Sequence, residues 1–280
     1  MRFRSLPSLL GTVFLFVFLR GALAQASFVY IPVKPPHMAR GVTVVVHGLN
    51  LKPSKMLELA EQLETMNQDV VLVTLTGHDD DEKAFGTVTR EVWLNDLSEA
   101  FQEASSKAKA VGVPIQFLGF SVGGLLGVDL LAAGKVHFSK MILLAPALQV
   151  HARSRLIRVA RILGNSFVIP SRSPEDYRAH SGTTVAAYEA LFKSLDTMAA
   201  SNLDLANIPT RVFIDPDDEL VSLEKTETFI AKKRLSNWKL SSVDASQSLT
   251  EPKYHHLIID SKSLGEAEWK KLVEQIRSFL

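Results

Sequence analysis

A serine flanked by glycines lies near the middle of the chain, in the run Gly-Phe-Ser-Val-Gly at 119–123. An apolar run at 115–118 precedes it, and small and apolar residues follow it. A sharp turn from a strand into a helix projects a serine hydroxyl, and larger side chains at the glycine positions would crowd that turn. The pattern therefore predicts that Ser121 is a nucleophile. A glycine-rich helix start in a nucleotide-binding fold fits less well, because 119–124 match neither phosphate-binding pattern.

A serine hydroxyl is a weak nucleophile at neutral pH and needs a histidine base, which a carboxylate in turn orients. In chains with a serine turn of this type, the acid and then the histidine follow in chain order. The acid candidates after Ser121 are Asp215, Asp217 and Asp218; the base candidates lie in Tyr-His-His-Leu at 254–257. The residue types alone leave both choices open.

Acyl transfer also needs donors for the oxyanion of the tetrahedral intermediate, usually two backbone N–H groups. The residue after the nucleophile supplies one of them, which here is Val122. The second should come from a loop after an early strand, where Leu49 follows Val-His-Gly at 46–48. Because His47 precedes the serine, we expect it to hydrogen-bond this loop rather than to act as the base.

The elements that must hold these residues alternate between short strands and helices. Strand patterns rich in Val, Ile and Leu occur at 42–46, 70–75, 115–118, 141–144, 211–214 and 238–243, and helix patterns at 56–66, 92–110 and 266–279. Nearly continuous apolar strands separated by helices indicate a parallel sheet that is buried on both faces. The sequence therefore predicts an open, doubly wound α/β sheet.

One stretch, 147–207, breaks this alternation. It has no convincing strand pattern, but apolar residues recur at helical spacing around Leu156 to Leu163 and around Val185 to Leu195. We interpret this stretch as a helical insertion over the sheet. Its apolar residues either pack within the insertion or line a substrate pocket, and both can hold for different residues.

From Gly41 to Leu280 the chain resembles the α/β-hydrolases, and within them the monoacylglycerol-lipase-like and small carboxylesterase branches. The residues that carry the resemblance are Val46-His47-Gly48, Leu75-Thr76-Gly77-His78, the helix start Val92-Trp93-Leu94-Asn95-Asp96, the serine turn and Tyr254-His255-His256-Leu257. The resemblance implies a helical cap inserted between late core strands. We expect a signal peptide at 1–24, a first core part at 25–146, the cap at 147–207 and a second core part at 208–280.

The resemblance also implies one choice of acid and base. The acid of such relatives falls in a G-x-x-D-x-x-V arrangement; here Asp215 replaces the glycine, but Asp218 keeps its spacing to Val221. The base of such relatives directly follows the tyrosine of a similar Tyr-His-x-Leu run, which indicates His255. The expected triad is thus Ser121, Asp218 and His255.

These residues predict hydrolysis of a carboxylic ester through an acyl-enzyme, with no cofactor and no metal. The resemblance implies a monoacylglycerol or another short-to-medium acyl ester as the small-molecule substrate. Amide or peptide hydrolysis on the same triad is the nearest alternative. A non-catalytic binding protein that kept the fold is an alternative from a different class.

Composition limits the remaining functions. The 280 residues carry a formal charge of +1, with basic and acidic residues dispersed, so a nucleic-acid partner has no support. The absence of cysteine excludes disulfides and thiol catalysis. At the N-terminus Arg2 and Arg4 precede an apolar run at 9–19 and then Ala-Leu-Ala at 22–24.

That terminal pattern is typical of a secretory signal. We expect cleavage after Ala24, a periplasmic or secreted product, and no stable membrane anchor after cleavage. An uncleaved signal anchor is the alternative, although the apolar run is shorter than the ~20 residues that span a bilayer.

Overall fold

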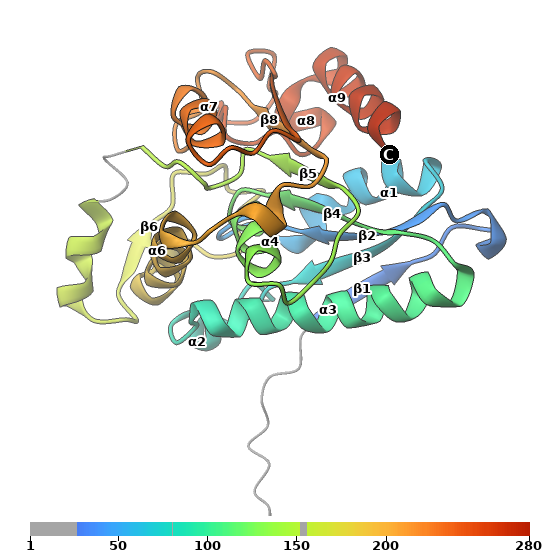
Figure 1. Cartoon of the computed structure of the whole chain (residues 1–280). Helices are drawn as coiled ribbons and strands as arrows, with labels where there is room; N and C mark the ends of the chain where they lie inside the picture. The colour runs from blue at the N-terminus through green and yellow to red at the C-terminus, as the bar shows by residue number, and fades with distance from the viewer. Residues whose placement is uncertain (1–26, 80, 152–155) are drawn as a thin grey trace, which may run out of the picture.

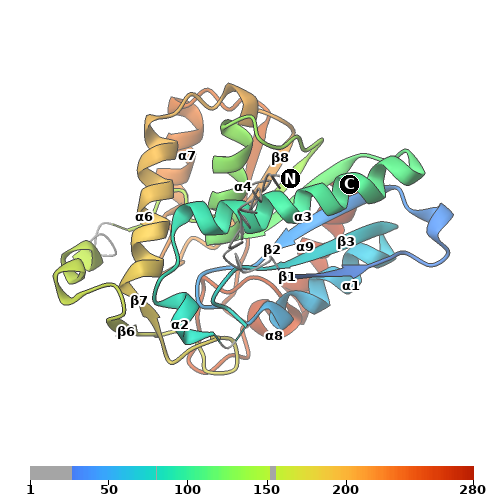
Figure 2. The same cartoon turned by 90° about the horizontal axis from the view of Figure 1, so that it is seen from below.

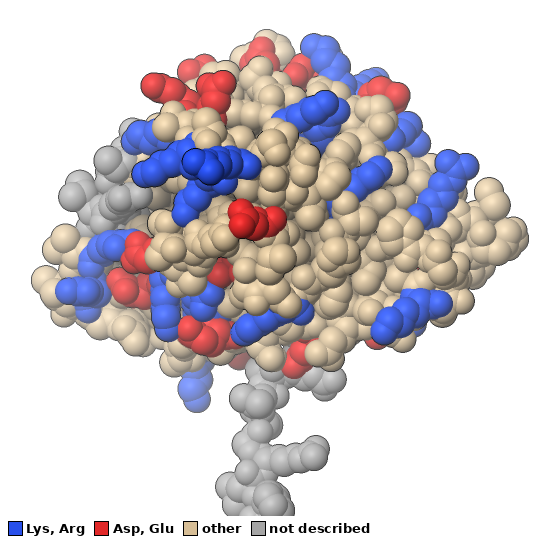
Figure 3. All heavy atoms as spheres, viewed as in Figure 1, with Lys and Arg blue, Asp and Glu red and all other residues tan. Residues whose placement is uncertain are grey.

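A computed structural model describes residues 27–79, 81–151 and 156–280. The predicted signal peptide at 1–24 lies outside the described residues. No helix in the described part of the chain is both long and apolar enough to cross a membrane. On the face drawn in Figure 3, lysine and arginine side chains are interspersed with acidic ones, in keeping with the dispersed charge of the sequence.

The central sheet has seven strands in the order β1-β3-β2-β4-β5-β8-β9. Their bounds are β1 Ser27–Ile31, β2 Gly41–Val46, β3 Gln68–Thr74, β4 Ile115–Phe120, β5 Met141–Leu144, β8 Thr210–Ile214 and β9 Trp238–Ser242. Strand β1 pairs antiparallel with β3 at one edge, and all other neighbours are parallel. Parallel strands end at the same edge of a sheet, so the loops that follow β2, β4 and β8 meet there.

Helices cover both faces of this sheet (Figures 1 and 2). Helices α3 (Arg90–Val111), α4 (Val122–Ala132) and α6 (Val185–Ala200) pack into one apolar cluster, and α1 (Leu57–Thr65) and α9 (Glu266–Phe279) into the cluster on the other face. The other α-helices of the described residues are α2 (Glu82–Phe85), α7 (Leu223–Lys232) and α8 (Ser261–Leu264), and short 3-10 helices lie at Pro36–Met38, Pro53–Met56 and Asp204–Ala206. The predicted mostly parallel, doubly wound sheet is confirmed.

The six predicted strands and three predicted helices are all present, with ends shifted by a few residues at most. Strand β1 was not predicted. It is a half-exposed edge strand, so its sequence Ser-Phe-Val-Tyr-Ile lacks the continuous burial of the inner strands. It pairs with β3 from Ser27↔Thr74 to Ile31↔Val70.

The segment between β5 and β8 holds the short 3-10 helix Leu156–Leu163, the two-stranded sheet of β6 (Val168–Pro170) and β7 (Gly182–Thr184), and α6. The expectation that this stretch lacks strands is therefore wrong, because two three-residue strands are too short to show a period in the sequence. Val159 is 64% exposed, so the first apolar stripe does not pack wholly into a core. The domain boundaries at 147 and 207 stay predictions.

Candidate active site

Ser121 occupies a tight turn between β4 and α4. Its backbone has φ 52° and ψ −115°, a conformation that costs a non-glycine residue roughly 1–3 kcal/mol. The turn brings α4 against the end of β2, and a Cβ at Gly123 would lie 2.4 Å from the carbonyl oxygen of Val46. Glycine at 123 therefore permits the close approach that the sequence pattern predicted.

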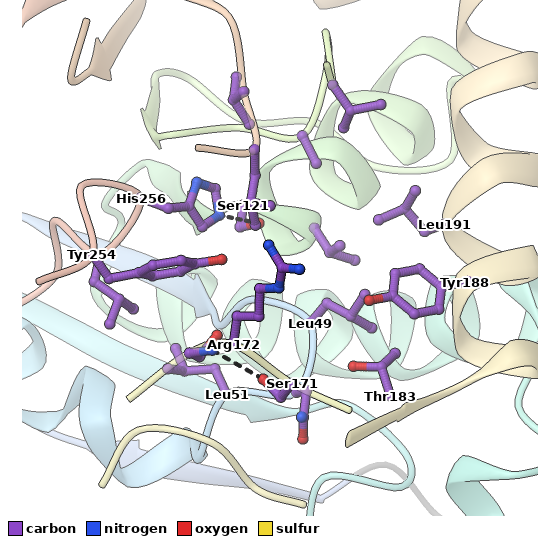
Figure 4. A pocket seen from close by; sticks show the side chains of 18 of the residues that line it. Leu49, Leu51, Ser121, Ser171, Arg172, Thr183, Tyr188, Leu191, Tyr254 and His256 are labelled. Carbon is purple, nitrogen blue, oxygen red and sulfur yellow. Dashed lines mark hydrogen bonds between the residues drawn. The ribbon is translucent and has the colours of Figure 1, made fainter. Parts of the chain in front are cut away.

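His256 is the histidine that contacts the serine. Its Nε2 lies 2.9 Å from Ser121 Oγ, and its Nδ1 lies 2.8 Å from Asp218 Oδ2. When the Nδ1–H donates to the carboxylate, Nε2 is left as the acceptor for the serine hydroxyl, which is the tautomer a general base requires. Figure 4 shows His256 and Ser121 joined in this way.

Asp218 lies in the loop after β8 and is only 4% exposed. Its Oδ1 accepts hydrogen bonds from the amides of Leu220 (2.7 Å) and Val221 (2.8 Å), which leaves Oδ2 for His256. These amides hold the carboxylate in the orientation in which its Oδ2 faces Nδ1 of His256. The structure brings the predicted Asp218 beside the site, whereas Asp217 is exposed to solvent.

His255 does not reach Ser121, so the prediction that it partners the serine is corrected. Its Nδ1 lies 3.0 Å from Asp215 Oδ2 instead, on the other side of the loop. Burial lowers the pKa of His255, but the hydrogen bond and charge of Asp215 outweigh that effect and raise it. His255 and His256 are the central residues of a turn, which the hydrogen bond from the Leu257 amide to the Tyr254 carbonyl closes at 3.0 Å. Their side chains therefore point in different directions, and the second histidine faces the serine.

Glu219 fixes this loop through its backbone. One carboxylate oxygen accepts the amide of His255 and the other accepts the amide of His256, both at 3.1 Å. The side chain next to Asp218 in the sequence therefore holds the segment that carries the imidazole. Sequence reasoning missed this residue, since nothing in the acidic run at 215–219 distinguishes it.

The two predicted oxyanion donors lie on the pocket wall beside Ser121. Val122 is the first residue of α4, where backbone N–H groups have no partner within the helix. In the described part of the chain, no hydrogen bond uses the Leu49 amide. Both residues line the same cavity as Ser121. Both amides are therefore available to a negatively charged oxygen.

Asn50 holds the loop of Leu49. Its side chain donates to the carbonyl of His180 and accepts the amide of His180, at 3.1 and 2.8 Å. Its own amide donates to Nε2 of His78 at 3.0 Å, and its φ is 53°. The loop is thus attached both to the turn after β3 and to the inserted segment.

Three further buried groups belong to or contact the turn at 75–78, which adjoins this loop. His47 donates from Nδ1 to the carbonyl of Gly48 and accepts the Leu75 amide at Nε2, as the sequence suggested for a structural histidine. Burial lowers the pKa of His47 to about 4 and that of His78 well below its ordinary value. Burial raises the pKa of Asp96 to about 6, against the hydrogen bonds that it accepts from the amide and hydroxyl of Thr76.

One group of three side chains has the composition of a metal site. Potential ligand atoms of Asp215, Asp217 and His255 lie within 4.8 Å of one another. However, Asp215 already accepts the amides of Asp217 and Ala245 and faces His255 Nδ1. A hard cation needs about six oxygen ligands, so these three side chains do not define a cation site.

A cavity of about 430 Å³ opens beside Ser121 and His256. Its wall is mainly apolar and includes Leu191 and Phe192 of α6, from the second apolar stripe of the insertion. This volume and lining suit a small organic ligand. Arg172, which the sequence analysis did not single out, also lines the cavity (Figure 4).

Comparison with known proteins agrees with this fold. Residues 37–172 match the serine aminopeptidase S33 family. Comparison with curated proteins finds no match. Among solved structures, a soluble variant of monoglyceride lipase from Saccharomyces cerevisiae is similar with a TM-score of 0.74 at 16% identity, over 90% of this chain and 91% of that chain.

Two other similar structures are those of a metagenome-derived lipolytic enzyme and of Est1E. A metagenome-derived lipolytic enzyme of the LipS and LipT study has a TM-score of 0.70 at 19% identity, over 91% and 99% of the two chains. Est1E from Butyrivibrio proteoclasticus with ferulic acid has a TM-score of 0.60 at 19% identity, over 90% and 95%. The likeness to these structures shows that the chain has the α/β-hydrolase fold, and the family match covers residues 37–172 of it.

Proposed function

We propose that this protein is a serine hydrolase that cleaves carboxylic esters, with Ser121 as nucleophile, His256 as base and Asp218 as the residue that orients the base. The observation that carries the proposal is the continuous hydrogen-bonded chain from Asp218 through His256 to Ser121, at 2.8 and 2.9 Å. This chain ends at an apolar cavity in which an acyl group can lie.

In the first half of the reaction, Ser121 Oγ attacks the ester carbonyl carbon while its proton passes to His256 Nε2. The carbonyl oxygen becomes an oxyanion, which the Leu49 and Val122 amides stabilise. The carbon–oxygen bond of the ester then breaks, and His256 returns the proton to the departing alcohol. The acyl group remains bonded to Ser121.

In the second half, water attacks the acyl carbon and gives a proton to His256. The bond between the acyl carbon and Ser121 Oγ breaks, and the proton on His256 passes to Oγ. The carboxylic acid leaves, and the enzyme returns to its starting state. Asp218 stays ionised throughout and stabilises the imidazolium that forms twice in each cycle.

A fluorophosphonate probe tests this proposal directly, because it bonds covalently to an activated serine. We expect labelling of the wild-type protein at Ser121, identified by peptide mass spectrometry, and no labelling of Ser121→Ala. Ser121→Ala should also lose ester turnover and keep its fold, since only a hydroxyl is removed. Labelling at another residue, or turnover by Ser121→Ala above a few per cent, would contradict the proposal.

Amide hydrolysis is the second candidate, and the match to a serine aminopeptidase family favours it. The same triad can serve both reactions, which differ in the leaving group that the base must protonate. Acyl esters of graded length with matched amides separate the two. Higher kcat/KM for the esters at every length supports the ester assignment, and the reverse supports the amide assignment. The chain-length optimum tests the proposal of monoacylglycerol or a similar acyl ester as substrate.

We also propose that the protein is exported with cleavage after Ala24. The support is the sequence pattern of the first residues alone. Expression of the full chain, followed by N-terminal sequencing of the product outside the cytoplasm, should give Gln25 as the first residue. An intact N-terminus on a membrane-bound product would favour the signal anchor.

A further inference from the structure

Arg172 brings a positive charge to an otherwise uncharged cavity wall. Among the described residues that line the cavity, it carries the one permanent charge; the others are apolar or neutral polar residues and His256. Figure 4 shows its side chain extending from the segment between β6 and α6 towards Ser121. A guanidinium at this position faces the space where the substrate of the proposed reaction must lie.

The backbone that carries Arg172 is held on both sides. The amide of Ser173 donates to the hydroxyl of Ser171 at 3.2 Å, which closes a turn around Arg172. The amide of Ser171 donates to the carbonyl of Ser181 at 3.1 Å, which joins this turn to the strand pair β6 and β7. The guanidinium therefore projects from an ordered support.

No acidic side chain in the described part of the chain forms an ion pair with Arg172. The neighbouring Arg178 pairs with Glu175, and Arg158 pairs with Asp196, but Arg172 forms no such bond. Nor does its guanidinium stack on an aromatic ring, as that of Arg158 does on Phe192. Its five N–H donors in a planar fork match the two oxygens of a carboxylate or phosphate, and they remain available to a ligand.

We propose that Arg172 selects esters that carry a further anionic group, a carboxylate or a phosphate, on the acyl or the alcohol part. The apolar wall holds the hydrocarbon portion of such a substrate, and the guanidinium pairs with its anionic group. This inference rests on the proposed ester hydrolysis for its chemistry, because Ser121 must lie within reach of the same molecule. It goes further by naming a chemical class of substrate and the residue that recognises it.

Two matched pairs of esters test the proposal. The first pair places the charge on the acyl part: mono-para-nitrophenyl glutarate against para-nitrophenyl pentanoate. The second pair places it on the alcohol part: para-carboxyphenyl butanoate against its neutral methyl ester. For each pair, the measured quantity is the ratio of kcat/KM for the anionic over the neutral ester.

Arg172→Ala should lower this ratio about two- to fivefold for at least one pair, the range for an exposed ion pair, because Arg172 is itself exposed. The affected pair shows which part of the substrate carries the anion. Arg172→Lys should give an intermediate ratio, because an ammonium keeps the charge but not the fork. Raising the salt concentration should lower the ratio in wild type and leave it nearly constant in Arg172→Ala.

Arg161→Ala is the matched control. Arg161 is an exposed arginine of the same inserted segment and does not line the cavity, so its removal should leave both ratios unchanged. Unchanged ratios in Arg172→Ala would overturn the inference. So would an equal loss for anionic and neutral esters, because that result assigns Arg172 to the oxyanion of the transition state, which every ester forms.

Binding separates this inference from the proposed reaction. In Ser121→Ala, which cannot form the acyl-enzyme, calorimetry measures the Kd of the anionic esters with and without Arg172→Ala. A Kd that rises about twofold or more on loss of Arg172 supports the anion site even if the wild type hydrolyses no ester. If the wild type hydrolyses esters, but neither the Kd nor the ratio of kcat/KM changes on loss of Arg172, the anion site is rejected. The proposed ester hydrolysis is then unaffected.

Discussion

The two adjacent histidines should respond very differently to alanine. His256→Ala removes the acceptor that lies 2.9 Å from Ser121 Oγ, and with it the proton transfer in both halves of the reaction. Loss of a triad base costs about 10⁴- to 10⁶-fold in kcat, or about 5–8 kcal/mol of transition-state stabilisation. His255→Ala removes a partly exposed pair with Asp215, a type of interaction that contributes about 0.2–1 kcal/mol. Its kcat should therefore fall less than about tenfold.

Steady-state hydrolysis of a short acyl ester and the rate of fluorophosphonate labelling measure both variants. Thermal unfolding shows whether each variant is folded, and His256→Gln serves as a second variant that keeps a polar side chain next to Asp218. Comparable collapse of kcat in folded His255→Ala and His256→Ala would refute the assignment of a single base. Collapse in His255→Ala alone would mean that the loop adopts the opposite orientation during the reaction.

Further substitutions test the acid beside His256, the residue that holds the histidine loop, and the buried Asp96. Asp218→Asn should lower kcat about 10⁴-fold, because an amide at this position favours the wrong histidine tautomer. Asp217 is exposed, so Asp217→Asn should change kcat less than about twofold. The opposite ranking would assign the acid to Asp217. Glu219→Ala should lower kcat about tenfold with little change in KM, because it removes the acceptor of both histidine amides. Glu219→Gln should restore part of the rate. Equal rates for the two variants would exclude a positioning role. The pKa of Asp96 is about 6 in the folded state against an ordinary 3.8, so its protonated form favours folding. This contribution to the free energy of unfolding is fully present below about pH 4 and is lost as the pH rises through 6, by at most about 3 kcal/mol. Urea unfolding should show the advantage of Asp96→Asn over wild type growing by up to that amount between pH 4 and pH 7, and a constant difference would mean that Asp96 ionises normally.

The sheet could be predicted because its inner strands are buried on both faces. Such strands are apolar at nearly every position, and β2, with Gly-Val-Thr-Val-Val-Val, shows this pattern clearly. Strand β1 is exposed on one side and pairs through its backbone, so its side chains carry no comparable signal. The short strands β6 and β7 depend on contacts within the insertion rather than on their own pattern.

Ser121 could be predicted from the local pattern at 119–123, and Asp218 from the spacing that the resemblance to the α/β-hydrolases implies. The choice between His255 and His256 could not. Both imidazoles have a carboxylate partner, at 3.0 and 2.8 Å. What separates them is the direction of the loop, and this depends on Glu219, a residue 36 positions away from His255.

The proposed oxyanion side of the site is held by the insertion as well as by the core. The carbonyl of Asn50 accepts the amide of Ala179, and Leu51 forms a backbone bridge with Arg178, so the residues directly after Leu49 pair with the inserted segment. A cap that only covered the cavity would alter substrate preference and leave the chemistry intact. Here the same segment that lines the cavity also holds the loop of the Leu49 amide. Changes in the insertion that loosen this pairing should therefore reduce kcat for every ester, in addition to any effect on selectivity.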